Sequence, residues 1–368
     1  MNGFEIIQKM SFKYINWFMK NNCFTQFGAR YISGGNQKVL FSQSSIMKPK
    51  VLITNPTIPQ IGIGLLQKKC EVIICRDKPP SRQEILDKVK GVHGLFWCST
   101  ERLDEEVLNL AGPQLKVAST YSAGYDHIDV DLLKSRNIKL GNTGNVSSDC
   151  VAEVAVGLCL MAAHRLAEGR DFALVSKMVH GNVDPSWLLG HELRNSVIGI
   201  VGLGGIGAEI ARRLKAFKIC DILYAGNREK QEGRDLGAKF VPLDELAEKS
   251  DFIVISCLLN DKTRNMIGRD FFEKTKCSAI VVNVARGEII DQEALIEALN
   301  CGRIWGAGLD VTTPEPLPPG HPLLSAPRCV ITAHQGTATK KTRDEMAALT
   351  AKNILAALFD EEMPSRVV

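Results

Sequence analysis

Short apolar runs alternate with helix-like segments through the second half of this 368-residue chain. The apolar runs lie at 197–201, 221–225, 251–257, 278–284, 305–311 and 329–333. Helices are expected between them at 206–217, 243–249, 270–275 and 291–300. Strands that are apolar on both faces and alternate with helices are typical of a parallel sheet covered by helices on both sides. The pattern therefore predicts an α/β domain with a doubly wound sheet.

A second series of the same kind precedes it. Strands are expected at 51–54, 70–75, 92–98 and 115–120, with helices at 84–91 and 103–111. We interpret the long apolar helix at 150–166 as the joint between two domains, and the amphipathic helix at 342–359 as a return to the first. The predicted division is a flavodoxin-like substrate domain at 49–150, a Rossmann cofactor domain at 151–333 and a return segment at 334–368.

The first 48 residues differ in composition from the rest. Residues 1–50 hold seven lysines and arginines but one glutamate, whereas the whole chain carries a net charge of +4. A basic leader that is poor in acids favours a mitochondrial transit peptide. The alternative is a tail upstream of a start at Met47, which would leave the protein cytoplasmic.

Composition argues against several classes of protein. The remainder of the chain is close to neutral, which does not indicate a nucleic-acid surface. No apolar run reaches the ~18 residues of a membrane span. The eleven cysteines include no C-x-x-C pair and the histidines no H-x-x-x-H pair, so neither a disulfide framework nor a metal site is predicted.

The loop after the strand at 197–201 has the spacing G-x-G-x-x-G. Gly202, Gly204 and Gly207 would allow a tight turn, close approach of a pyrophosphate and close packing of the next helix. Because the helix N-terminus favours anions, we expect a dinucleotide cofactor there.

The residues after the strand at 221–225 bear on which dinucleotide binds. An acidic residue there would select NAD by accepting the ribose hydroxyl, but Asn227 and Arg228 stand near that place. These residues favour the 2′-phosphate of NADPH, with NADH possible. The alternative is that Arg228 is only solvated and Glu229 accepts the ribose.

Three residues with complementary chemistry follow later strands of this domain. Arg286 can bind a carboxylate with two hydrogen bonds, and His334 can supply a proton near neutral pH. Glu315 beside the histidine would stabilise its protonated form. All three are expected at the same edge of the sheet as the glycine loop.

Four ordered segments, "VGLGGIG", "NVARGEIID", "AGLDVTTPEP" and "TAHQGTAT", resemble signatures of the D-isomer-specific 2-hydroxyacid dehydrogenases. The resemblance runs from about 49 to 366. It is strongest to the glyoxylate/hydroxypyruvate reductase branch, through "STYSAGYDHIDVDLLKSRNIKLGNTGNVSSDCVAE", "WLLGHEL", "SDFIVISC" and "EPLPPGHPLLSAPRCVIT". It implies NADPH-dependent reduction of small 2-oxo acids, glyoxylate to glycolate and hydroxypyruvate to D-glycerate, by a homodimer.

The resemblance also implies roles for individual residues. His334 would be the acid/base group, Glu315 its partner and Arg286 the substrate arginine. Substrate would further contact Ala123, Gly124, Asp310 and a partner subunit's tryptophan, for which Trp187 is the candidate. The cofactor would contact Gly202, Gly204, Gly205, Ile206, Gly207, Asn227, Arg228, Leu258, Val284, Asp310 and Gly336.

The chain departs from the family pattern in three places. Ala333 stands where a proline commonly precedes the histidine, "LLNDKT" lacks a common proline, and Asn227 replaces the reductases' phosphate-binding arginine. Other members of the fold stay open as alternatives: an NAD(H)-sensing corepressor, phosphoglycerate dehydrogenase and formate dehydrogenase. The last usually has glutamine at the place of Glu315.

Overall fold

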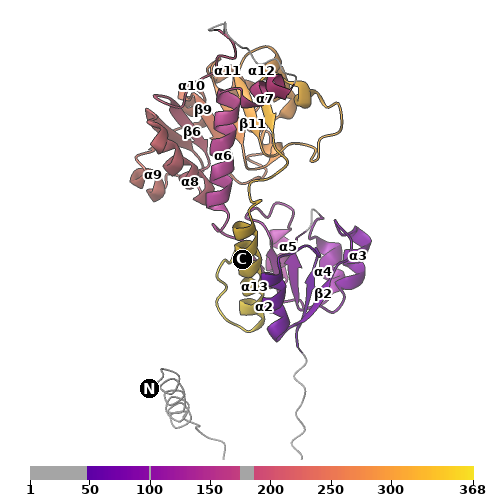
Figure 1. Cartoon of the computed structure of the whole chain (residues 1–368). Coiled ribbons are helices and arrows are strands. Elements are labelled where there is room, and N and C mark those ends of the chain that lie inside the picture. The colour runs from indigo at the N-terminus through magenta and orange to yellow at the C-terminus, as the bar shows by residue number, and fades with distance from the viewer. Residues whose placement is uncertain (1–47, 99–100, 175–185) are drawn as a thin grey trace, which may run out of the picture. The chain divides into compact units, whose positions relative to one another are not determined.

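The structure is a computed structural model that describes residues 48–98, 101–174 and 186–368. The predicted leader, except Lys48, lies outside the described residues, and the mitochondrial or cytoplasmic location stays a prediction. Residues 48–368 form one compact unit that contains two separate sheets, with helices on their faces (Figure 1). Every strand pair in both sheets is parallel. The predicted α/β class with two parallel sheets is confirmed.

The first sheet has the strand order β2-β1-β3-β4-β5, which is the flavodoxin-like order. Its strands are β1 (Lys50–Ile53), β2 (Glu71–Ile74), β3 (Gly94–Trp97), β4 (Val117–Thr120) and β5 (Lys139–Gly141). The first four match the apolar runs of the sequence, whereas β5 was not expected. Buried side chains pack on both faces of this sheet, as a doubly covered parallel sheet requires.

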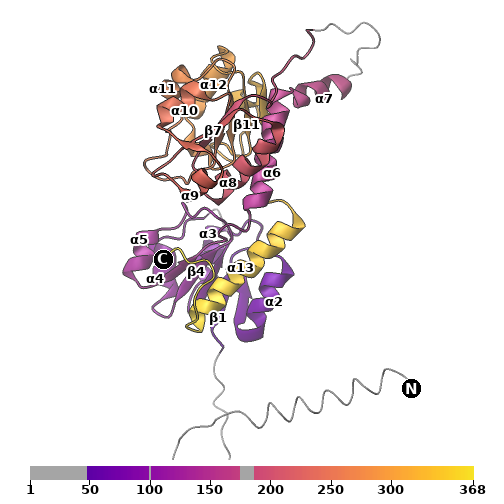
Figure 2. The same cartoon turned by 90° about the vertical axis from the view of Figure 1, so that its left-hand side faces the viewer.

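In the part of the chain that the structure describes, five helices cover the first sheet. They are α2 (Gln60–Lys69), α3 (Arg82–Lys88), α4 (Glu105–Ala111), α5 (Val130–Ser135) and α13 (Lys340–Leu358). Side-chain oxygens of Ser81, Asp104 and Asp129 cap the N-termini of α3, α4 and α5 and so fix where these helices begin. The helix expected at 342–359 is α13, and it packs against α2, β3 and β4 although it is the last helix of the chain (Figure 2).

The second sheet has the order β12-β11-β10-β9-β6-β7-β8. Its strands are β6 (Val197–Val201), β7 (Asp221–Ala225), β8 (Lys239–Phe240), β9 (Phe252–Ile255), β10 (Ile280–Asn283), β11 (Gly306–Leu309) and β12 (Cys329–Ile331). All six strands predicted from apolar runs are present, and the short edge strand β8 adds a seventh. Strand order reverses beside β6, and a ligand of an open α/β sheet binds at such a switch point.

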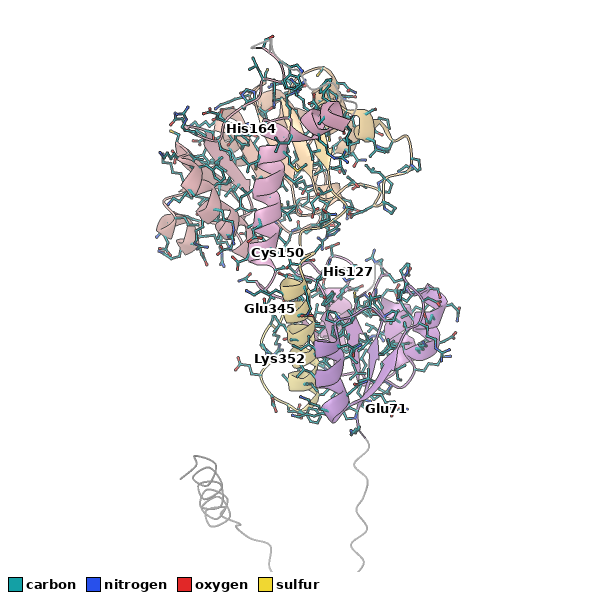
Figure 3. All side chains as sticks on the ribbon, viewed as in Figure 1. Glu71, His127, Cys150, His164, Glu345 and Lys352 are labelled. Atoms are coloured by element: carbon teal, nitrogen blue, oxygen red, sulfur yellow. The ribbon has the colours of Figure 1, made fainter. Side chains whose placement is uncertain are left out.

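The helices associated with the second sheet are mostly short. They are α6 (Ser148–Ala163), α7 (Leu166–Leu174), α8 (Gly205–Leu214), α9 (Gln231–Asp235), α10 (Leu243–Lys249), α11 (Arg269–Lys274) and α12 (Gln292–Asn300), with 3₁₀ turns η1 (Lys215–Phe217), η2 (Gly287–Ile289) and η3 (Pro322–Ser325). The long helix α6 packs on α8, β10 and β11. It therefore belongs to the core of the second sheet. Its N-terminal turn approaches the first half, where Cys150 Sγ lies 3.8 Å from Thr339 Oγ1 (Figure 3).

Among the described helices, none is by itself long and apolar enough to cross a membrane, although α6 and α7 together meet the length and hydropathy test as a bent pair. Within the same residues, no cluster of three or more His, Cys, Asp or Glu side chains is placed to hold a metal ion.

The packing of α13 generates a stability prediction. Ile354 in α13 is fully buried beside β3, where its Cγ2 would lie 3.1 Å from a Cβ at Gly94. Replacing Ile354 by Ala leaves a cavity and should lower the free energy of unfolding by about 2–5 kcal/mol. Urea denaturation measures this, with Lys352→Ala on the exposed side of α13 as the control. A loss below about 1 kcal/mol would contradict the role of α13 as core of the first sheet.

Candidate active site

The three predicted reacting residues follow three neighbouring strands. Arg286 comes shortly after β10, Glu315 after β11 and His334 after β12, and these strands are adjacent in the sheet. Because the strands are parallel, their carboxyl ends lie at one edge. The glycine loop follows β6 at the same edge. The loops that carry these residues therefore lie at one edge of the sheet, where they were predicted to lie.

The glycine loop is tight at its first and third glycines, whereas a Cβ at the second, Gly204, would meet no atom within 4 Å. Gly202 has a φ of 95°, and a Cβ there would lie 2.6 Å from Cys257 Cα. A Cβ at Gly207 would lie 2.3 Å from the carbonyl oxygen of Gly202. Gly204 is the N-cap of α8 and provides no capping side chain. The first N–H groups of α8 thus remain available to an anion, which fits the pyrophosphate of a dinucleotide.

The next two loop residues begin α8. Gly205 is the first residue of the helix and Ile206 the second, and a Cβ at Gly205 would lie 2.2 Å from Asn145 Oδ1. Asn145 belongs to the segment between β5 and α6. The glycine therefore lets this segment approach the start of α8 closely.

The turn after β7 presents exposed polar side chains. Asn227 and Arg228 are both exposed, and neither side chain has a hydrogen-bond or ion-pair partner among the described residues. Glu229 is bound instead by Arg234, whose Nε and Nη2 lie 3.0 and 2.8 Å from its two carboxylate oxygens. These hydrogen bonds lower the pKa of Glu229. Glu229 is thus paired with a cation, although its carboxylate keeps acceptor sites that a ribose hydroxyl could use.

The loop after β4 contains Ala123 and Gly124. Both carbonyl oxygens accept side-chain hydrogen bonds. Asn142 Nδ2 donates to the Ala123 oxygen at 2.8 Å, and Ser122 Oγ donates to the Gly124 oxygen at 2.6 Å. Neither the Ala123 N–H nor the Gly124 N–H donates a hydrogen bond to another described residue. Two free N–H groups in a fixed loop can bind an anionic oxygen.

His127 supports the same loop from a more buried position. Its Nε2 lies 3.3 Å from Thr120 Oγ1, which lies 2.8 Å from Ser122 Oγ. Burial lowers the pKa of His127; the Asp126 carboxylate opposes this shift and the Arg286 charge adds to it. Burial thus favours a neutral ring here, and the chain of contacts from His127 through Thr120 and Ser122 ends on the carbonyl of Gly124.

Arg286 lies directly against the Ala123–Gly124 loop. A Cβ at Gly124 would lie 2.3 Å from Arg286 Nη2, so a side chain there would displace the guanidinium from this position. Arg286 Nε donates to Asp126 Oδ1 at 3.1 Å, and Nη1 donates to the Ala285 oxygen at 2.8 Å. The structure thus brings together the arginine and the loop that were predicted to hold one carboxylate.

His334 and Glu315 form the second pair of the site. His334 Nδ1 lies 3.1 Å from Glu315 Oε1. Because a carboxylate accepts, Nδ1 carries the proton of this contact, and the other ring nitrogen, Nε2, can then accept or donate a proton. Nε2 makes no hydrogen bond to the rest of the described chain. Both side chains are exposed, His334 by 50% and Glu315 by 39%.

Asp310 fixes the loop that carries His334. Its side chain is buried, and Oδ1 accepts from Thr332 Oγ1 and the Gln335 N–H, both at 2.7 Å, while Oδ2 accepts from the Gly336 N–H at 2.8 Å. Its backbone oxygen accepts from the His334 N–H at 2.9 Å. The sequence indicated Asp310 as a contact of substrate and cofactor; the structure adds an anchoring role that takes up most of its acceptor capacity.

The other predicted contacts lie on elements of the same sheet or beside it. Val284 is buried just after β10, and Leu258 is 53% exposed just after β9. Gly336 is held by Asp310. Trp187 is 41% exposed and packs on Phe172 with ring centroids 5.9 Å apart. Its predicted contact with a partner's site, and the cofactor contacts of the other residues, stay predictions.

Comparison with known proteins supports this geometry. Residues 156–336 match the family described as D-isomer specific 2-hydroxyacid dehydrogenase, NAD binding domain. A mouse protein, glyoxylate reductase/hydroxypyruvate reductase, is 44% identical over 332 residues, which is 87% of this chain and 99% of that protein.

The chain belongs to the D-isomer-specific 2-hydroxyacid dehydrogenase family.

Solved structures agree with this assignment. A glyoxylate reductase from Paecilomyes thermophila is 30% identical with a TM-score of 0.78, over 87% of this chain and 98% of that one. An NADPH-dependent glyoxylate/hydroxypyruvate reductase from Sinorhizobium meliloti, in complex with NADP and malonate, is 27% identical with a TM-score of 0.75, over 87% and 97%. The protein is therefore an enzyme, an oxidoreductase that uses a nicotinamide cofactor.

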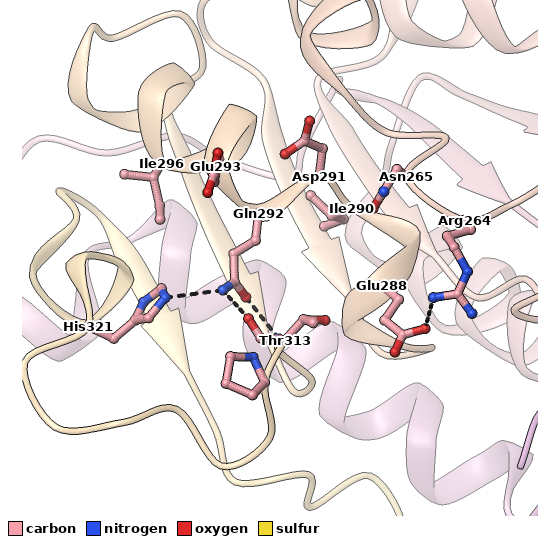
Figure 4. Close-up of a pocket in the computed structure, with 11 residues that line it drawn as sticks. Arg264, Asn265, Glu288, Ile290, Asp291, Gln292, Glu293, Ile296, Thr313 and His321 are labelled. Atoms are coloured by element: carbon pink, nitrogen blue, oxygen red, sulfur yellow. Dashed lines mark hydrogen bonds and ion pairs between the residues drawn. The ribbon is translucent and has the colours of Figure 1, made fainter.

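One supporting residue of this dehydrogenase was not anticipated from its sequence. Gln292, at the start of α12, accepts from the Thr313 N–H at 2.9 Å through Oε1 and donates to the Thr313 oxygen through Nε2 (Figure 4). This two-point contact holds the backbone two residues before Glu315. Gln292 also lines a cavity of about 460 Å³ with Arg264 and His321, to which none of the predicted catalytic side chains contributes. A side chain that binds backbone 21 residues away leaves no signature in the local sequence.

Proposed function

We propose that this enzyme uses NADPH to reduce small 2-oxo acids, glyoxylate to glycolate and hydroxypyruvate to D-glycerate. The observation that carries the proposal is the contact between His334 and Glu315 at the sheet edge where Arg286 meets the Gly124 loop. A proton donor and a carboxylate-binding arginine are what a 2-oxo acid requires, because its reduction places charge on the carbonyl oxygen.

Each residue has a defined task in this proposal. The free N–H groups of Ala123 and Gly124 and the guanidinium of Arg286 bind the substrate carboxylate. Arg286 also polarises the neighbouring carbonyl. His334 donates its Nε2 proton to the carbonyl oxygen as negative charge develops there, and Glu315 stabilises the protonated ring at Nδ1. When bound, the reduced nicotinamide supplies the hydride, and the protein supplies orientation and electrostatics.

The substrates are inferred from relatives. The mouse protein is named for glyoxylate and hydroxypyruvate. A relative from Pyrococcus furiosus is named glyoxylate reductase, and it is 39% identical over 324 residues. Both substrates are small 2-oxo acids, which agrees with a site that holds one carboxylate and one carbonyl. The relatives' names give no preference between glyoxylate and hydroxypyruvate.

The preference for NADPH is inferred from the turn after β7. Arg228 has no partner among the described residues, and the nearest acid, Glu229, is bound by Arg234. A positive, unoccupied side chain favours a 2′-phosphate, whereas NAD selection needs a free acceptor for the ribose hydroxyl. The S. meliloti structure, named NADPH-dependent, adds support by similarity.

Loss of the proton donor is the most direct test of the mechanism. His334→Gln should lower kcat for glyoxylate reduction by at least ~10²-fold, the usual scale for removing general acid catalysis. Titration of cofactor fluorescence should still report binding. The control is His164→Gln, which changes an exposed histidine at the end of α6. A variant with nearly normal turnover would remove His334 from the reaction.

The pairing of His334 with Glu315 makes a separate prediction. The carboxylate lies 3.1 Å from Nδ1 of the ring that donates the proton in the proposed mechanism. Glu315→Gln removes the negative charge and should lower kcat/KM for glyoxylate by about tenfold, the lower range for a charge-assisted hydrogen bond. Steady-state kinetics measure this. An unchanged kcat/KM would show that Glu315 does not act on His334.

Cofactor choice is tested at Arg228. A charge-assisted contact contributes about 1.5–3 kcal/mol, or roughly 10- to 150-fold in affinity. NADPH should accordingly exceed NADH by at least about tenfold in kcat/KM, and Arg228→Ala should erode this ratio through the KM for NADPH. Arg269→Ala, which removes an exposed arginine of α11, is the control. Equal use of both cofactors by the wild type would refute the proposed preference.

A further inference from the structure

Arg286 is held at two of its nitrogens before any substrate binds. Nε donates to Asp126 Oδ1 at 3.1 Å and Nη1 donates to the Ala285 oxygen at 2.8 Å. The two contacts lie on different parts of a planar group, so together they fix both its position and its rotation. The Arg286 and Asp126 side chains are 28% and 26% exposed, so water still reaches this pair.

Nη2 is the nitrogen that neither contact uses. It is also the atom that comes closest to the carboxylate loop, because a Cβ at Gly124 would lie 2.3 Å from Nη2 and 3.1 Å from Asp126 Oδ1. Gly124 is therefore close to both the Arg286 guanidinium and the Asp126 carboxylate. Its N–H and that of Ala123 have no acceptor within the described chain. Free donors of the loop and of the guanidinium thus occur side by side.

We propose that Asp126 is a positioning residue that binds the Nε edge of Arg286 and thereby directs Nη2 at the substrate carboxylate held by the Gly124 loop. This inference rests on the proposed function, in which Arg286 binds that carboxylate. Asp126 does not touch the reacting atoms, and it acts through the arginine.

The position of Asp126 gives the contact a second consequence. Asp126 follows β4 in the first sheet and Arg286 follows β10 in the second, 160 residues apart. The guanidinium is therefore directed correctly only while the edges of the two sheets are close together. Assembly of the carboxylate site is coupled in this way to the approach of the two halves.

Two other roles for Asp126 predict different results. If Asp126 only bridged the two sheets, its loss would lower stability and would affect cofactor and substrate kinetics alike. If Asp126 occupied the arginine in competition with substrate, its loss would lower KM for the 2-oxo acid. A positioning role instead predicts a raised KM for the 2-oxo acid and an unchanged KM for NADPH.

The first experiment compares three variants in the full-length enzyme. Asp126→Asn should lower kcat/KM for glyoxylate by about tenfold, the lower range for a charge-assisted hydrogen bond, mainly through KM. Asp126→Glu keeps the charge and should recover part of the loss. Asp131→Asn removes a carboxylate of α5 that is 95% exposed and should leave kinetics unchanged. A lower KM in Asp126→Asn, or equal effects on NADPH and glyoxylate, would overturn the proposal.

The second experiment is a double-mutant cycle with Arg286→Lys. Lysine has no Nε edge for Asp126 to bind, so Asp126→Asn should change kcat/KM less than about twofold in that background. Additive losses would mean that Asp126 acts by another route. The single Arg286→Lys variant separates the two hypotheses. If it reduces glyoxylate normally, the proposed role of the arginine fails; if it is impaired while Asp126→Asn is normal, only the positioning role fails.

Discussion

The position of His334 depends on the hydrogen bonds that the buried carboxylate of Asp310 accepts. It follows β11 and accepts hydrogen bonds from Thr332, Gln335 and Gly336, the residues around the end of β12. His334 lies within this segment with a φ of 51°, a region that costs energy for a residue with a side chain. The hydrogen bonds to one carboxylate, together with the His334 N–H bond to the Asp310 oxygen, offset that cost. They also hold the segment next to Ala333, where the family pattern commonly has a proline.

Much of the fold could be predicted because its strands are buried on both faces. Ten of the twelve observed strands correspond to apolar runs of the sequence. The two that were missed have local sequences that carry little signal. Strand β8 has two exposed residues, and β5, Lys139–Gly141, contains a charge and a glycine. Strand β5 forms because β4 lies beside it and because Leu140 exchanges hydrogen bonds with Val367 and Val368 at the chain end, contacts that no local pattern records.

The reacting residues of the candidate site could be predicted from the sequence, but the residues that hold them in place could not. Residues such as Arg286 and His334 follow apolar strands and belong to known motifs, so their edge of the sheet followed from topology. Gln292, by contrast, reaches the loop of Glu315 through a side-chain amide, and Asp126 reaches Arg286 from the other sheet. Such pairs depend on tertiary distances. The close approach of the guanidinium to Gly124 likewise becomes visible only in the structure.

The exposure of the His334–Glu315 pair bears on how the site works. At exposures of 50% and 39% the pair is partly screened by water, and its electrostatic contribution is correspondingly weak. A cofactor on the glycine loop and an acid on Arg286 would both occupy the edge of the sheet that carries this pair. Displacing water from that edge lowers the local dielectric and strengthens the attraction between carboxylate and imidazolium. In the proposed mechanism, Glu315 therefore holds the protonated ring most firmly when both substrates are bound, the state in which the ring faces the carbonyl oxygen.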